Sequence, residues 1–238
     1  MLLLACDTSD STCCAGIYRD GKEEGYELSM EKKTHSETFM PLVARVFDKC
    51  GVNFGDIDRI AVTVGPGSFT GIRIGMSAVL GMAAATDKDI GIVPVSSTMA
   101  LARSVENVSY DQTDTCYIPC FDARNNRVFA QATDADTYET VMEEGAYNAS
   151  DVAKKIEEDL QHRYKNFIVI GSGADAMSKA IEECCPFINV QYAKGAVILP
   201  KGIAEAAKGI DPVRPEELKA KYCAVSRAER YHTGDELK

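Results

Sequence analysis

Residues 59–86 read RIAVTVGPGSFTGIRIGMSAVLGMAAAT, and this stretch decides the fold. Residues 59–64 form an apolar run of strand length, and residues 72–86 have the length and composition of a helix. The glycine loop between them consists of Gly65, Pro66, Gly67, Ser68, Phe69, Thr70 and Gly71. A strand, a glycine loop and a helix in this order predict one unit of an α/β fold.

The residues before this unit predict three strands and a helix. Residues 1–6, 12–18 and 22–28 have strand patterns, with the hairpin signal Asp20-Gly21 between the last two. Thr34-His35-Ser36-Glu37 has the form of a capping box, so a helix should run from there to about residue 50. Its apolar residues recur at helical spacing and are Phe39, Leu42, Val43, Val46, Phe47 and Cys50. Pro41 lies beyond the first turn and predicts a kink or a later start.

The residues after this unit repeat the same order of elements. Strands are expected at residues 90–95, 116–121, 127–133, 137–142, 167–170 and 188–192, and helices at 97–103, from about 150, at 174–184 and at 200–208. The polar stretch 106–115 is the best lobe boundary. We therefore predict two α/β lobes, residues 1–105 and 106–238, with a duplicated order of elements.

Composition and charge restrict the function classes. The 238 residues are 45% hydrophobic and 26% charged, which is typical of a folded soluble protein. The apolar run 1–6 ends at Asp7 and is too short for a signal peptide or a membrane span, and the nine cysteines lack metal spacing, so we expect a cytoplasmic protein without membrane attachment. A net charge of −10 opposes direct binding to nucleic acid, so any contact with RNA should require a partner.

Chemistry is weakly indicated by the local motifs. Glycines at a helix start let backbone amides bind an anion, but the loop lacks a P-loop lysine, and a tight structural turn explains it as well. Asp7, Thr8 and Ser9 follow the first predicted strand, where they can lie near a nucleotide or form an ordinary turn. The three histidines are far apart in sequence, so no metal site is predicted.

The helix after the glycine loop favours association with another surface. From residue 74 to residue 86 it has no charged side chain, and apolar or small residues surround it. One stripe contains Gly71, Gly75, Ala78, Met82 and Ala85, and a neighbouring one contains Ile72, Met76, Val79 and Ala83. One stripe is expected on the sheet and the other either on a partner subunit or inside the monomer.

Several motifs together resemble the TsaB family. They are Asp7-Thr8-Ser9, Thr34-His35-Ser36-Glu37, Gly65 to Gly75 and Phe121-Asp122-Ala123-Arg124. The resemblance covers residues 1 to about 130, and Tyr222 with Arg227, Ala228 and Glu229 resembles the family's terminal motif with altered spacing. It implies a two-lobed α/β fold of the sugar-kinase, actin and heat-shock-chaperone superfamily (ribonuclease H-like).

The resemblance also implies a function without catalysis by this chain. TsaB dimerises with the catalytic subunit TsaD, which transfers threonylcarbamoyl to the adenosine beside the anticodon of tRNAs that read codons beginning with A. The ATPase TsaE joins the complex, tRNA is bound only through the complex, and an adenine nucleotide can occupy the partners' interface. By this resemblance the partner interface contains His35, Ser36, Glu37, Phe39, Met40, Val43, Ile74, Ser77, Ala78 and Gly81, with Arg73 beside the glycine loop.

Two alternatives to a heterodimer subunit stay open. One is an enzyme that acts alone, either an ATP-using phosphotransferase or a glycoprotease-like metallopeptidase, although no catalytic constellation is apparent. The other is a homodimer, which the chain is expected to form through the uncharged helix when it is alone.

Overall fold

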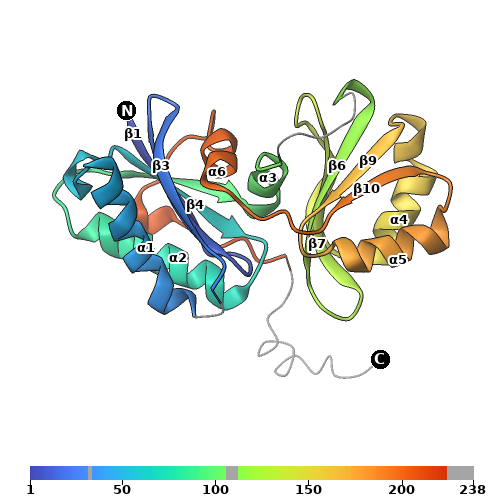
Figure 1. Ribbon diagram of the computed structural model, residues 1–238, viewed down its shortest axis with the longest axis horizontal. Helices are drawn as coiled ribbons and strands as arrows, with labels where there is room; N and C mark the ends of the chain where they lie inside the picture. Colours follow the sequence, from blue (N-terminus) through green and yellow to red (C-terminus); the bar gives the residue numbers. More distant parts are fainter. Residues whose placement is uncertain (32–33, 106–111, 224–238) are drawn as a thin grey trace.

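The protein consists of two lobes side by side, each built on a five-stranded mixed sheet (Figure 1). The computed structural model describes residues 1–31, 34–105 and 112–223. The first sheet has the strand order β3-β2-β1-β4-β5 and the second the order β10-β9-β6-β7-β8. Read in chain order, the two sheets have the same connectivity, which confirms the predicted duplication and the two-lobed α/β fold.

The first lobe opens with an antiparallel meander and continues with parallel crossovers. Its strands are β1 (Leu2–Asp7), β2 (Cys13–Arg19), β3 (Lys22–Ser29), β4 (Arg59–Gly65) and β5 (Gly91–Ser96). Its helices are α1 (His35–Cys50), α2 (Phe69–Ala84) and α3 (Ser97–Ala102). The parallel pairs β1–β4 and β4–β5 require the crossover helices α1 and α2, which pack on the same face of the sheet (Figure 1).

The second lobe repeats this plan. Its strands are β6 (Thr115–Asp122), β7 (Arg127–Asp134), β8 (Thr140–Asn148), β9 (Asn166–Ile170) and β10 (Asn189–Ala193). Its helices are α4 (Ala149–Glu158) and α5 (Ala174–Cys184), and α6 (Pro200–Ala206) follows β10 in the chain as α3 follows β5. β6 pairs antiparallel with β7 and parallel with β9, as β1 does with β2 and β4.

The protein has three hydrophobic cores, one within each lobe and one between the lobes. One lies between the first sheet and α1 and α2, and a second between the second sheet and α4 and α5. The third lies between the two sheets, around α3 and α6, where Leu101 and Ile203 pack with Leu3 and Tyr117. Both sheets are therefore covered on both faces, as sheets with parallel crossovers require.

The end of the described chain returns to the first lobe. α6 packs on β1 and α3, and Val213 then pairs with Ile92 at the edge of the first sheet. The predicted division at residues 105 and 106 places this segment with the second lobe in sequence, whereas in space it lies against the first. Residues 106–111 of the predicted boundary are outside the described residues.

One helix start and one helix cap differ from the prediction. α2 begins at Phe69, three residues before the predicted start, because the Ser68 hydroxyl accepts a hydrogen bond from the backbone N–H of Gly71 and caps the helix. The capping box predicted at residues 34–37 does not form, because the Thr34 hydroxyl accepts from the Ser36 hydroxyl instead of a backbone N–H. α1 runs from His35 through Pro41.

Candidate protein-binding site

The glycine loop is a tight structural turn held against the end of β1. The Ser68 N–H donates to the Ser9 carbonyl at 2.6 Å, and the Thr8 hydroxyl donates to the Gly71 carbonyl at 2.7 Å. A Cβ atom at Gly67 would lie 2.3 Å from the Ser9 carbonyl oxygen, and one at Gly71 would lie 2.0 Å from that of Thr8. Glycine is therefore required at both positions, because any side chain would push the backbones apart.

Asp7, Thr8 and Ser9 lie under this loop and are buried. One carboxylate oxygen of Asp7 accepts from the Ser9 N–H at 2.9 Å, from the Ser9 hydroxyl at 2.6 Å and from the Thr63 hydroxyl. Burial raises the pKa of the Asp7 carboxyl, against the lowering effect of the bonds from Ser9 and Thr63. The predicted nucleotide-proximal residues and the glycine loop thus come together. The side chains of Asp7, Thr8 and Ser9 are buried between the loop and the core.

Replacing Asp7 with asparagine is expected to change how stability depends on pH. The raised pKa means that the folded protein keeps a proton that the unfolded chain has released. The contribution of the Asp7 carboxyl to the free energy of unfolding is therefore fully present below the unfolded pKa, about 3.9. This contribution is lost as the pH rises through the pKa that Asp7 has in the folded protein. The asparagine variant lacks this loss, so its free energy of unfolding minus that of the wild type should rise with pH and then level off.

Urea unfolding of both proteins across the acid and neutral range measures this difference. A difference that falls as the pH rises would contradict the prediction, because it would mean a lowered pKa for Asp7 in the folded state.

α2 buries one side and exposes another that has no charged side chain after Arg73. The buried residues are Gly71, Ile72, Gly75, Met76, Val79, Met82 and Ala83. The exposed stripe consists of Thr70, Arg73, Ser77, Gly81 and Ala84. Ile74 and Ala78 flank it and are half-buried. The two stripes of small and apolar residues described from the sequence are therefore largely buried. The face of α2 that points outward is a third stripe, which contains the predicted interface residues Ser77 and Gly81.

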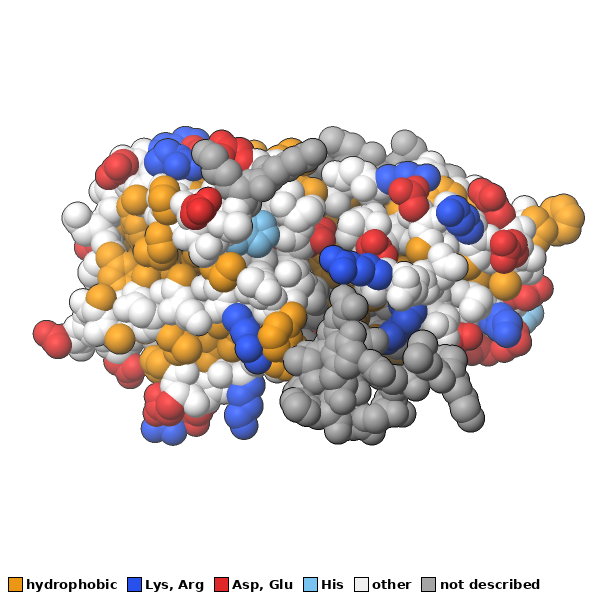
Figure 2. Space-filling model, turned by 90° about the horizontal axis from the view of Figure 1, so that it is seen from below, with side chains coloured by type: hydrophobic (Ala, Val, Ile, Leu, Met, Phe, Trp, Pro, Cys, Tyr) orange, Lys and Arg blue, Asp and Glu red, His pale blue; other side chains and the backbone are white. Residues whose placement is uncertain are grey.

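α1 adds a few side chains to the same face. Ser36, Glu37 and Met40 are exposed, whereas Phe39 and Val43 are 1% and 2% exposed and belong to the core of the first lobe. His35 contacts the Asp10 carbonyl through its Nε2 at 2.7 Å. Figure 2 looks onto this side of the molecule, where hydrophobic side chains gather over the first lobe and most charged side chains lie around its margin.

An aromatic and guanidinium cluster closes one end of the exposed stripe. The Arg73 guanidinium carbon lies 3.8 Å from the centre of the Phe69 ring, and its Nε donates to the Tyr222 hydroxyl at 3.0 Å. The Phe69 and Tyr222 rings are 5.0 Å apart. Tyr222 belongs to residues 212–223, which we call the C-terminal strap. Arg227, Ala228 and Glu229 of the predicted terminal motif are outside the described residues.

The C-terminal strap also bonds to the second lobe. The Lys221 N–H donates to the Val64 carbonyl at 2.7 Å, and its ammonium group lies 2.6 Å from a carboxylate oxygen of Glu144. The Glu144 side chain, from β8, is 3% exposed, and its other oxygen accepts from the hydroxyls of Ser96 and Thr98 in the first lobe. One buried carboxylate therefore joins both lobes and the strap.

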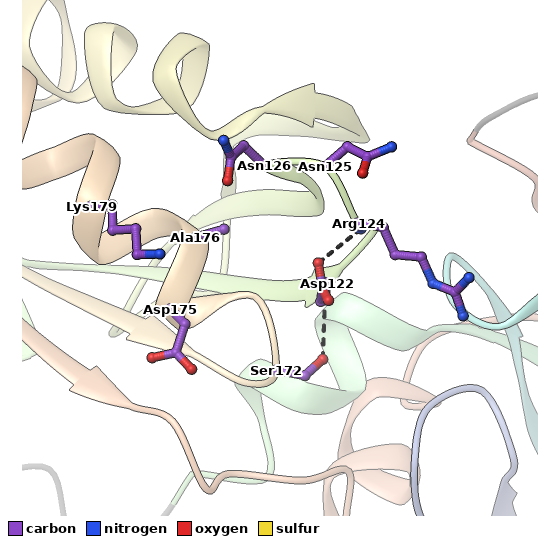
Figure 3. Close-up of a pocket in the computed structure, with 8 residues that line it drawn as sticks. All are labelled: Asp122, Arg124, Asn125, Asn126, Ser172, Asp175, Ala176 and Lys179. Atoms are coloured by element: carbon purple, nitrogen blue, oxygen red, sulfur yellow. Dashed lines mark hydrogen bonds between the residues drawn. The ribbon is translucent and has the colours of Figure 1, made fainter.

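The fourth motif, Phe121-Asp122-Ala123-Arg124, shapes a turn in the second lobe. The Asp122 carboxylate accepts from the Arg124 N–H at 2.8 Å, and the Asp122 N–H donates to the Ser172 hydroxyl at 3.2 Å. With Asp175 and Lys179 these residues line a shallow polar cavity of about 370 Å³ at the start of α5 (Figure 3). In Figure 3 the Arg124 side chain extends away from the Lys179 side of this cavity.

Within residues 1–31, 34–105 and 112–223, no group of three or more histidine, cysteine, aspartate or glutamate side chains is arranged to hold a metal ion. In the same ranges, no helix has the length and apolar character of a membrane span.

The geometry defines a class of protein. Two lobes with duplicated mixed sheets, joined through α3 and α6, form a protein of the sugar-kinase, actin and heat-shock-chaperone type. A solved structure, YeaZ from Pseudomonas aeruginosa, has this fold, with a TM-score of 0.73 and 22% identity over 93% of this chain and 99% of that one.

The chain belongs to the family described as "TsaD: tRNA N6-adenosine threonylcarbamoyltransferase", whose model matches residues 29–207. Curated relatives named "tRNA threonylcarbamoyladenosine biosynthesis protein TsaB" confirm the resemblance to TsaB. Those from Haemophilus influenzae and Bacillus subtilis are 30% and 35% identical over 54% of this chain, and the matches span about half of each relative (52% and 53%). The protein from Escherichia coli is 24% identical over 96% of this chain and 93% of its own length.

Proposed function

We propose that this chain is a non-catalytic subunit that binds a TsaD-type catalytic subunit through the exposed face of α1 and α2. The observation that carries the proposal is Gly81, which lies on the exposed stripe in the last turn of α2. A Cβ atom there would have no neighbour within 4 Å, so the fold of the monomer does not require glycine. Glycine in a helix costs about 1 kcal/mol relative to alanine. A second helix that packs closely on α2 supplies the reason for it.

The composition of α2 supports the same proposal. From Ile74 to Ala84 it has no charged residue, yet Ser77, Gly81 and Ala84 are exposed. A solvated helix surface normally has charged side chains, whereas the centre of a protein interface is depleted of them. Small residues allow two helices to approach closely, with Met40 of α1 and Ile74 of α2 contributing apolar contacts at the edges.

The proposed assembly transfers threonylcarbamoyl to the adenosine next to the anticodon of tRNAs that read codons beginning with A. In it the TsaD-type subunit performs the chemistry, a TsaE-type ATPase completes the complex, and tRNA is bound only through the complex. An adenine nucleotide is bound at the subunit interface and not by this chain alone. The protein works in the cytoplasm, and in the absence of its partner it forms a homodimer through the same face.

The test is reconstitution with the TsaD-type and TsaE-type proteins of the same organism. Size-exclusion chromatography with light scattering should show a homodimer for the chain alone and a heterodimer after the TsaD-type subunit is added. Threonylcarbamoyl transfer to tRNA should require all three proteins, because the proposal gives this chain no reaction of its own. Nucleotide hydrolysis, peptide cleavage or tRNA modification by the isolated chain would overturn the proposal in favour of an enzyme that acts alone.

A further inference from the structure

Arg73 is the single charged residue in the sequence of α2, and it lies on the exposed stripe that the proposed partner covers. An arginine at the margin of an interface can stay hydrated, and then it contributes little to affinity. An arginine held in one orientation before binding contributes more, because less side-chain entropy is lost when its hydrogen bonds form. The contacts of Arg73 distinguish these two cases.

The guanidinium of Arg73 is held by two aromatic side chains within the monomer. Its planar group lies over the Phe69 ring at 3.8 Å, its Nε donates to the Tyr222 hydroxyl at 3.0 Å, and the Tyr222 ring is 5.9 Å from the guanidinium carbon. Stacking on an aromatic face favours a fixed plane for the guanidinium. The Nε bond to Tyr222 then fixes the direction in which the two terminal nitrogens point.

Tyr222 is itself anchored by the residue before it. Lys221 donates its backbone N–H to Val64 of β4 and places its ammonium group on the buried Glu144 carboxylate. The C-terminal strap is therefore fixed to both lobes one residue before it meets Arg73. This arrangement positions the Tyr222 side chain beside Phe69 and Arg73 of α2.

Arg73 has no ion pair to a carboxylate within the part of the chain that the structure describes, although its terminal nitrogens carry four N–H donors. We propose that the Phe69–Arg73–Tyr222 cluster is a preorganised anchor for a carboxylate side chain of the TsaD-type partner, and that Tyr222 is the residue that positions it. Arginine forms two parallel hydrogen bonds with a carboxylate, so the anchor fixes both the register and the orientation of docking. This inference rests on the proposed function.

A protein carboxylate fits this position better than an RNA phosphate. The anchor is continuous with the uncharged part of the exposed stripe, which suits a protein surface and has no cationic groups for a phosphate backbone. The whole chain has a net charge of −10, which opposes the approach of nucleic acid. A partner that is negative at this one point is attracted to Arg73 and packs on the small residues beyond it.

The test compares variants in titration calorimetry with the TsaD-type subunit at several salt concentrations. Arg73→Gln should weaken binding by about 30-fold or more, because a desolvated carboxylate of the partner loses its counter-charge. Arg73→Lys keeps the charge but loses the two parallel N–H donors of the guanidinium, and it should weaken binding by about 10-fold. Tyr222→Phe keeps the aromatic ring and the charge of Arg73, and it should weaken binding by roughly threefold, because the guanidinium loses only the hydrogen bond that orients it. Arg163→Gln, an exposed arginine of the second lobe, is the matched control.

The outcomes separate the anchor from the proposed function. If the wild-type chain does not bind the TsaD-type subunit, the proposed function fails. If the wild type binds and Arg73→Gln binds equally well with the same salt dependence, the anchor is overturned. Retained protein binding with a loss of tRNA affinity by the complex would assign the cluster to RNA and would also overturn it. A partner Asp→Lys or Glu→Lys variant that recovers binding to Arg73→Glu would identify the carboxylate.

Discussion

Replacing Gly81 with arginine is expected to weaken binding of the TsaD-type subunit by at least about 100-fold, with the monomer still folded. The position is open, so the new side chain meets no atom of its own chain within 4 Å of Cβ. Arginine is also a better helix former than glycine by about 0.5–1 kcal/mol, so thermal stability should hold or rise. In the complex, the same side chain would separate two closely packed helices and bring a charge into the centre of an interface.

The matched control is Gly195→Arg. Gly195 is exposed in the second lobe and likewise has open space around its Cβ position, so it tests the same chemical change away from the stripe. We expect unchanged affinity for this variant. Equal affinity of the Gly81 and Gly195 variants, measured by calorimetry with circular dichroism as the fold check, would remove α2 from the interface.

Replacing Glu144 with alanine is expected to destabilise the protein by about 2–4 kcal/mol. The carboxylate is buried, and its loss removes one acceptor shared by the hydroxyls of Ser96 and Thr98 and leaves Lys221 without its counter-charge. Because these groups come from both lobes and the strap, no single element can move to restore the contacts. Thermal unfolding should show a midpoint lower by roughly 5–15 °C.

Glu143→Ala provides the comparison for Glu144→Ala. It removes the neighbouring carboxylate of β8, which is exposed, and should change the free energy of unfolding by no more than about 0.5 kcal/mol. A Glu144 variant as stable as the Glu143 variant would show that the two lobes are held together by the core around α3 and α6 alone.

Much of the fold could be predicted because its signals are local. Alternating or continuous apolar runs place all ten strands, and the Asp20-Gly21 turn has the positive φ angles that this dipeptide predicts. β8 is less well placed, since it runs from Thr140 to Asn148 where the sequence predicted residues 137–142. The Thr34 capping box does not form, because a four-residue pattern does not determine which donor the hydroxyl meets.

The candidate site could be predicted only in part, because it depends on which way each helix faces. Phe39 and Val43 share helical spacing with Leu42 and Val46, and all four are buried, whereas the family resemblance placed the first two in the partner interface. Tyr222 is 149 positions from Arg73, and a contact over such a distance leaves no local pattern. Gly81 could be predicted from the sequence, because a helix without charged side chains indicates that its outward face is covered by another protein surface.

The return of the C-terminal strap to the first lobe sets an order for biosynthesis. The ribosome releases the first sheet, α1 and α2 early. Lys221, which pairs with Glu144, and Tyr222, which accepts a hydrogen bond from Arg73, emerge much later. A nascent chain therefore presents an unfinished docking face until residues 221 and 222 have been synthesised. The proposed assembly with a TsaD-type partner therefore favours chains that have been synthesised past Tyr222.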